Sequence, residues 1–179
     1  ADRLLAASIV GWAVAGLMSG GASLPGLVLL GLQCLVGLLL LIRSRSRHAA
    51  TAGQVARSLP SLAIGFWGLS VAPPPSAWPA AAILTFATGA LLAAVAFVAL
   101  GRSFAILPAA RQLVMRGPFR VVRHPGYAGQ WLLLLACGIA AGTPVGLLPA
   151  IVAVPLLALR VGAEEEVLAV RVAVGGLAL

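Results

Sequence analysis

Long apolar runs separated by short polar or glycine- and proline-rich segments constrain this chain more than any other feature. The runs cover residues 4–18, 24–42, 59–71, 78–100, 131–141 and 145–159. Of the 179 residues 61% are hydrophobic and only 9% are charged, whereas roughly a quarter of a soluble domain is charged. Lipid offers no partner to unpaired backbone groups, and the runs lack the alternation of barrel strands, so each is predicted to be a helix.

The predicted fold is therefore all-α, a polytopic membrane bundle of about six transmembrane helices. Five helices are the alternative, if one of the shorter runs merges with a neighbour or does not span. A chain of 179 residues has room for about five or six spans of ~20 residues. We expect residues 1–100 to supply the N-terminal transmembrane helices. Residues 101–179 are expected to form a C-terminal cofactor-binding and catalytic region that includes a helical hairpin.

The arginines are distributed on alternate sides of the runs. All twelve basic residues are arginine, and none lies in the loops after the first, third and fifth runs. Under the positive-inside rule, six spans with both termini in the cytoplasm place every arginine on one side. This pattern predicts a multi-pass protein of the cytoplasmic membrane. It also argues against nucleic acid as a partner, because the charge is dispersed among loops rather than gathered into a groove.

Two polar clusters interrupt the apolar sequence of the C-terminal half. Residues 117–129 hold two arginines, one of the two histidines and the only tyrosine. About forty residues later, Arg160, Glu164 and Glu165 close an apolar run, and residues 164–166 contribute three of the four acidic side chains. Ionisable groups at a membrane are costly and mark functional sites. The cysteines Cys34 and Cys137 lie inside apolar runs and indicate neither a disulfide nor a metal site.

The order of these clusters resembles the C-terminal signature of a family of membrane methyltransferases. This family includes isoprenylcysteine carboxyl methyltransferase and the phospholipid N-methyltransferases. The similarity covers roughly the last eighty residues and consists of a Leu113-Val114 lead-in, an Arg123-His124-Pro125-x-Tyr127 motif, two helices, and Arg160-x-x-x-Glu164-Glu165-x-x-Leu168.

The resemblance implies an S-adenosyl-L-methionine-dependent methyltransferase with a cofactor pocket near the cytoplasmic face. Transferred to this sequence, the expected cofactor-binding residues are Gln112, Leu113, Val114, Phe119, His124, Pro125, Gly126, Tyr127 and Glu164. Arg160 is expected to face the methyl acceptor. The expected catalytic residues are Arg160, Glu165 and His124.

The residue types suit this cofactor. Glu164 and Glu165 can offset its cationic groups or bind its ribose, and His124 suits its carboxylate. Phe119 and Tyr127 offer flat faces to adenine. Pro125 biases His124 away from helical dihedral angles, and Gly126 would let the backbone approach a ligand closely.

Simpler interpretations stand beside these assignments. Arg120 and Arg123 can be ordinary positive-inside anchors, Glu166 a solvated helix end, and Arg160 the cation of a last helical turn. The chain also departs from the family pattern. Phe119 stands where tyrosine is common, and the tail lacks the two tyrosines that often follow the glutamates.

The leading functional hypothesis is that the protein methylates a lipophilic acceptor, which enters from the bilayer. Membrane lipids are the other expected partners. The forked guanidinium of Arg160 favours a carboxylate acceptor of the isoprenylcysteine kind. An amine acceptor, as in a phospholipid, would need a base such as Glu165 or His124. A non-enzymatic membrane scaffold whose arginines contact anionic lipids is the alternative from another class, and a membrane reductase is a third.

Overall fold

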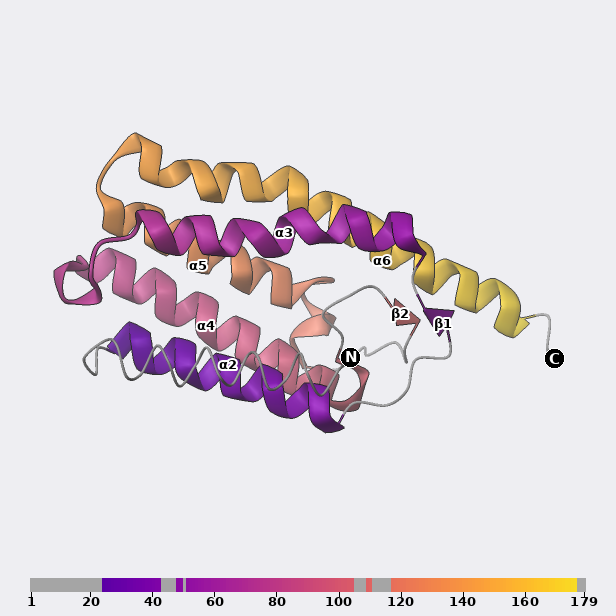
Figure 1. The fold of residues 1–179 in the computed structure, drawn as a ribbon. Coiled ribbons are helices and arrows are strands. Elements are labelled where there is room, and N and C mark those ends of the chain that lie inside the picture. Colours follow the sequence, from indigo (N-terminus) through magenta and orange to yellow (C-terminus); the bar gives the residue numbers. More distant parts are fainter. Residues whose placement is uncertain (1–23, 43–47, 50, 105–108, 111–116, 177–179) are drawn as a thin grey trace.

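Five α-helices lie side by side along a common direction in the part of the chain that the structure describes (Figure 1). The structure is a computed structural model and describes residues 24–42, 48–49, 51–104, 109–110 and 117–176. The helices are α2 (Leu24–Ile42), α3 (Ala52–Val71), α4 (Ala80–Leu100), α5 (Pro125–Ala141) and α6 (Leu148–Gly176). Short 3-10 helices η1 (Pro75–Ala77), η2 (Gly101–Ser103), η3 (Gly117–Arg120) and η4 (Pro144–Leu147) lie between them.

The predicted bundle of helices is confirmed in the described residues, whose only strands are the two-residue β1 and β2. Three segments are long and apolar enough to cross a membrane, namely Pro25–Ile42, Ala80–Leu100 and Pro144–Val167, and α5 is a shorter apolar helix. Helix α3 is not among these candidate spans, and the predicted run at residues 4–18 lies outside the described residues, so membrane spans at these two runs remain predictions.

Helix α3 begins at Ala52, whereas the sequence analysis placed its start at residue 59. A capping box explains the longer helix. The Gln54 backbone N–H donates to the Thr51 hydroxyl at 3.4 Å, and the Thr51 N–H donates to the Gln54 side-chain oxygen at 2.9 Å. These bonds satisfy donors that the first helical turn leaves without partners. Arg57, predicted to lie in a loop, is therefore a helical residue.

Helix α5 begins at Pro125 rather than at residue 131. Proline suits the first helical position, because its missing N–H has no partner there in any case. His124 is the residue before the helix, with φ −128° and ψ 64°, outside the helical region as predicted. The residues from Pro125 to residue 130, which precede the predicted apolar run, therefore form the start of the helix. At the other end Gly142 adopts the left-handed conformation (φ 66°) and terminates α5.

Helix α6 continues to Gly176, although the sequence analysis ended it at residue 159. At ~1.5 Å per residue its 29 residues extend about 43 Å, which exceeds the ~30 Å hydrocarbon core of a bilayer. Its C-terminal part projects beyond the other helices (Figure 1). Arg160 is consequently in the middle of a helix, and its interpretation as a last-turn cation is wrong.

A two-residue antiparallel ladder joins two loops at the end of the bundle from which α6 projects (Figure 1). Strand β1 (His48–Ala49) pairs with β2 (Ala109–Ala110), and His48 lies opposite Ala110. This pairing is absent from the sequence-based prediction because two-residue strands leave no periodic pattern. It brings the segment before α3 next to the segment before η3.

Helices α4 and α5 make the closest contact in the bundle through small residues. A Cβ added at Gly129 would lie 2.7 Å from the Gly89 carbonyl oxygen and 2.8 Å from the Ala93 nitrogen. Small residues allow such backbone approach between membrane helices. Beyond this contact, Trp78, Phe86 and Cys137 form a buried cluster, in which the Trp78 and Phe86 rings meet edge to face at 5.3 Å.

The described segments that carry Arg57, Arg120 and Arg123 lie at one end of the bundle. The end of α2, the start of α3, the end of α4 and the start of α5 lie at the end from which α6 projects (Figure 1). The opposite end carries η1 and η4, and residues 72–79 and 142–147 of its connections contain no lysine or arginine. Among the described residues, the bundle therefore has one basic end and one end without lysine or arginine.

The close contact at Gly129 generates a stability prediction. The substitution Gly129→Ala should lower the free energy of unfolding by about 1–3 kcal/mol, the usual cost of overpacking. The control is Gly65→Ala in α3, where an added Cβ has nothing within 4 Å. That change should be neutral or stabilising, because alanine favours a helix over glycine. Thermal unfolding in detergent measures both variants, and equal melting temperatures would contradict this account of α4 and α5.

Candidate functional site

A tyrosine on α5 and two charged residues on α6 meet inside the basic end of the bundle. The Tyr127 hydroxyl donates to Glu164 Oε1. Arg160 precedes Glu164 by one helical turn, and its Nε lies 3.9 Å from the same oxygen. The Arg160 guanidinium also lies over the Tyr127 ring, 4.9 Å from the ring centroid, close enough for a cation–π interaction. Arg160 is only 4% exposed, so the protein supplies the partners that water would otherwise provide.

His124 extends this cluster towards the surface. Its ring stacks on Tyr127 with a centroid distance of 5.8 Å and an interplanar angle of 21°. Its Nε2 lies 3.3 Å from Glu165 Oε1. His124 immediately precedes α5 and Tyr127 lies in its first turn, so the start of this helix places the two rings side by side. The structure thus brings together five residues that the sequence analysis selected: His124, Tyr127, Arg160, Glu164 and Glu165.

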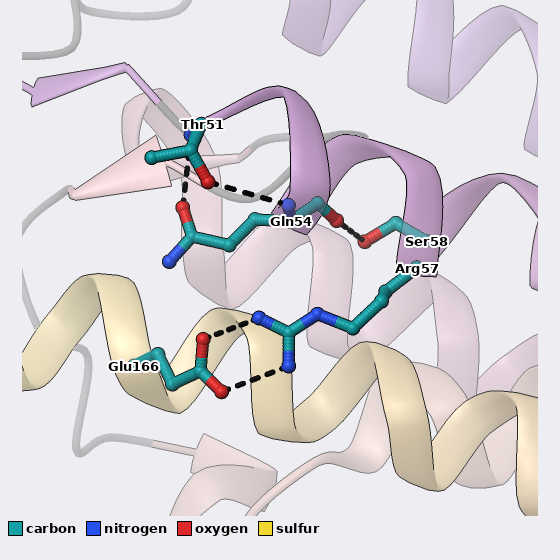
Figure 2. Close-up of polar contacts among 5 residues, drawn as sticks. All are labelled: Thr51, Gln54, Arg57, Ser58 and Glu166. Atoms are coloured by element: carbon teal, nitrogen blue, oxygen red, sulfur yellow. Dashed lines mark hydrogen bonds and ion pairs between the residues drawn. The ribbon is translucent and has the colours of Figure 1, made fainter.

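The three consecutive glutamates of α6 have three different partners. Successive residues of a helix point about 100° apart, so Glu164 reaches Tyr127, Glu165 reaches His124, and Glu166 reaches Arg57 on α3. Figure 2 shows the last pair as a two-pronged contact, in which Arg57 Nη1 donates to Glu166 Oε1 at 2.8 Å and Nη2 donates to Oε2. The bond to Glu166 raises the pKa of Arg57. Glu166 is exposed, as the sequence analysis expected, but α6 continues past it to Gly176, so it is not a helix end, and it ties α6 to α3.

Two polar residues that the sequence analysis missed complete the buried side of the cluster. Arg160 Nη1 donates to the Ser61 hydroxyl oxygen at 3.3 Å. Gln130, on α5, donates through Nε2 to the Ser61 backbone carbonyl at 2.8 Å. The available signal was the presence of hydrogen-bonding side chains within apolar runs, since such residues inside membrane helices usually face a partner.

Pro125 and Gly126 contribute to helix packing at the start of α5. Pro125 is fully buried at the start of α5. A Cβ added at Gly126 would lie 3.2 Å from the Phe97 ring of α4. The missing side chain of Gly126 therefore permits contact with α4, and its expected approach to a ligand stays a prediction.

The remaining predicted residues precede this cluster in the chain. Phe119 is half-buried in η3, which packs against α4. Gln112, Leu113 and Val114 lie outside the described residues. Strand β2, which ends two residues before Gln112, contacts α6.

The chemical character of the cluster is a buried cation beside a partly buried carboxylate, with a histidine–carboxylate pair at its outer edge. Arg160 can bind an anionic group, and Glu164 can bind a cation or hydroxyl groups. The His124–Glu165 pair resembles the arrangement in which a carboxylate orients a histidine that accepts a proton. The stacked rings of His124 and Tyr127 add a flat apolar surface.

Comparison with known proteins identifies the family. A family model described as phospholipid methyltransferase matches residues 77–171, just over half of the chain. All the predicted site residues fall inside this range, whereas α2 and α3 lie outside it. No curated protein and no solved structure matches the chain. The match sets aside the scaffold and reductase hypotheses. The chain therefore belongs to the phospholipid methyltransferase family, whose members are S-adenosylmethionine-dependent enzymes of membranes.

Proposed function

We propose that this protein transfers the methyl group of S-adenosylmethionine to a lipid that carries an anionic group. In this proposal Glu164, Tyr127 and His124 contact the cofactor, and Arg160 holds the anionic group of the acceptor. The observation that carries the proposal is the buried Arg160 guanidinium, one helical turn from Glu164 and in contact with Tyr127.

The donor set fits the cofactor. S-adenosylmethionine carries a sulfonium, an ammonium, a carboxylate, ribose hydroxyls and adenine. The Glu164 side chain is 25% exposed, so one carboxylate can bind Tyr127 and still reach a ligand with its remaining lone pairs. The stacked surface of His124 and Tyr127 suits adenine. We propose Gln112, Leu113, Val114 and Phe119 as further cofactor contacts, supported by the position of β2 against α6.

In methyl transfer the protein has to align the two reactants and does not have to activate them. When bound, the cofactor supplies a methyl group whose bond to the sulfonium breaks as a bond to the acceptor forms, leaving S-adenosylhomocysteine. The residues of this chain need to hold the acceptor atom in line and to exclude water. A forked, buried guanidinium suits the first task, because it binds two oxygens of a carboxylate or a phosphate in a fixed geometry.

The acceptor that needs the least from the protein is a carboxylate, which is already nucleophilic. We therefore propose a lipid-linked carboxylate of the isoprenylcysteine kind as the first candidate. A phospholipid amine is the second candidate, and two observations favour it. The family model is that of phospholipid methyltransferases, and His124 Nε2 lies 3.3 Å from Glu165, so this pair could accept the proton that an amine must lose.

We further propose that the basic end of the bundle faces the cytoplasm, with the protein in the cytoplasmic membrane. The support is the position of Arg57, Arg120 and Arg123 in segments at that end, together with the positive-inside rule. Residues 4–18 would form a sixth span, and residues 101–179 would carry most of the cofactor site, as the sequence analysis expected.

The topology can be tested by labelling single cysteines in a variant that lacks Cys34 and Cys137. A cysteine at Ser76 should react with a membrane-impermeant maleimide only from outside the cell. A cysteine at Arg123 should react only after the membrane is opened. Labelling of both positions from the same side would contradict the proposed orientation.

The cofactor assignment predicts weaker binding when its partners are removed. His124→Ala and Glu164→Gln should each reduce the affinity for S-adenosylmethionine by roughly 1–3 kcal/mol, the range for losing a hydrogen bond to a charged group. Glu166→Gln is the control, since Glu166 points to Arg57 and should leave the affinity unchanged. Calorimetry on folded protein in detergent measures all three. If the first two variants bind as tightly as the control does, the assignment is wrong.

If Arg160 binds the acceptor, a lysine that keeps only its positive charge should not replace it. Arg160→Lys should reduce turnover by about 100-fold, because a misplacement of roughly 1 Å can have that effect. The affinity for the cofactor should change little. Methyl transfer to N-acetyl-S-farnesylcysteine and to phosphatidylethanolamine vesicles measures turnover and identifies the acceptor class. Near-normal turnover would show that Arg160 serves only as the ion-pair partner of Glu164.

A further inference from the structure

Helix α3 lies outside the residues that the family model matches, yet it packs along α6 beside the candidate site. Two polar contacts join the helices: Arg57 to Glu166 and Ser61 to Arg160. The residue numbers rise along α3 as they fall along α6, so the helices are antiparallel. One turn of α3, from Arg57 to Ser61, therefore faces the stretch of α6 that carries the site residues.

Ser61 is the point where three helices meet. It is fully buried, with 0% exposure. Its hydroxyl donates to the Ser58 carbonyl at 2.8 Å. Because that bond uses the only hydroxyl proton, the oxygen is left as an acceptor, and it receives Arg160 Nη1 at 3.3 Å. Its backbone carbonyl accepts from Gln130 of α5 at 2.8 Å. Ser61 thus contacts α5 and α6 through separate atoms.

These contacts determine how the Arg160 guanidinium is oriented. An arginine side chain has many rotamers, and only a fixed fork binds two oxygens well. Tyr127 lies against the face of the guanidinium, Glu164 lies near Nε, and Ser61 holds Nη1. The first two contacts come from groups assigned to the cofactor. Ser61 is a contact from outside the cofactor-binding set.

We propose that Ser61 is a positioning residue for the acceptor, because it holds the Arg160 guanidinium in the orientation that receives the anionic group of the lipid. This inference rests on the proposed function. It extends the functional site to α3, within residues 1–100. It also gives the N-terminal half of the chain a part in acceptor specificity.

The test compares Ser61→Ala with Ser58→Ala. Ser58 is a matched control, because it lies on the same helix, is equally buried, and donates its hydroxyl to a backbone carbonyl, that of Gln54, at 3.0 Å (Figure 2). Ser61→Ala should lower kcat/KM for the acceptor by about tenfold or more. The affinity for S-adenosylhomocysteine and the melting temperature should match those of Ser58→Ala. The probes are N-acetyl-S-farnesylcysteine and phosphatidylethanolamine vesicles.

A double-mutant cycle separates positioning from a general structural effect. If Ser61 acts through Arg160, Ser61→Ala should have little further effect on kcat/KM in an Arg160→Lys background. Effects that multiply would overturn the inference. So would equal turnover of Ser61→Ala and Ser58→Ala, or a loss of cofactor affinity that parallels the loss of turnover. If the unmodified protein binds cofactor but methylates neither probe, the proposed acceptor chemistry fails, and the role of Ser61 fails with it.

Discussion

The burial of the Arg160 guanidinium in the middle of α6 is the constraint on which the rest of the site depends. Removing an ion from water costs several kcal/mol unless the protein replaces its hydration with charges and hydrogen bonds. Here the partners come from three helices: Ser61 of α3, Tyr127 of α5 and Glu164 of α6 itself. Because these partners come from more than one helix, α3 and α5 must both lie against α6 at a fixed position along its axis. The Arg57–Glu166 pair reinforces the same register at the outer end.

This arrangement also meets the two demands of methyl transfer. The cofactor is cationic at the reacting sulfur, and both proposed acceptors carry an anionic group. Arg160 and Glu164 are four residues apart on one helix, so their side chains project from the same face about one turn apart. The cation proposed to bind the acceptor and the carboxylate proposed to bind the cofactor therefore lie side by side. A rigid helix holds this spacing better than a loop would, and alignment is the main contribution that this reaction needs.

The apolar runs predicted the helices, because they are visible in the sequence alone. The two polar clusters and their resemblance to the methyltransferase family selected the five residues that the structure brings together. The helix limits were less accurate. The polar starts of α3 and α5 do not look apolar, although the Thr51–Gln54 capping box and the proline at position 125 were readable signals. The contacts of Ser61 with Arg160 and Gln130 could not be predicted, since they depend on the antiparallel register of α3 against α6. The role of Gly126 against Phe97 depends in the same way on tertiary packing.

The central claim is that the cofactor binds where α5 and α6 meet at the basic end of the bundle. Ultraviolet crosslinking of S-adenosylmethionine carrying a radiolabelled methyl group, followed by peptide mapping, tests it most directly. We predict label on the peptides that contain His124 and Tyr127 or residues 160–166, and competition by excess S-adenosylhomocysteine. Label confined to another part of the bundle, such as the apolar groove that Leu32, Leu35 and Ala94 line between α2 and α4, would contradict the account.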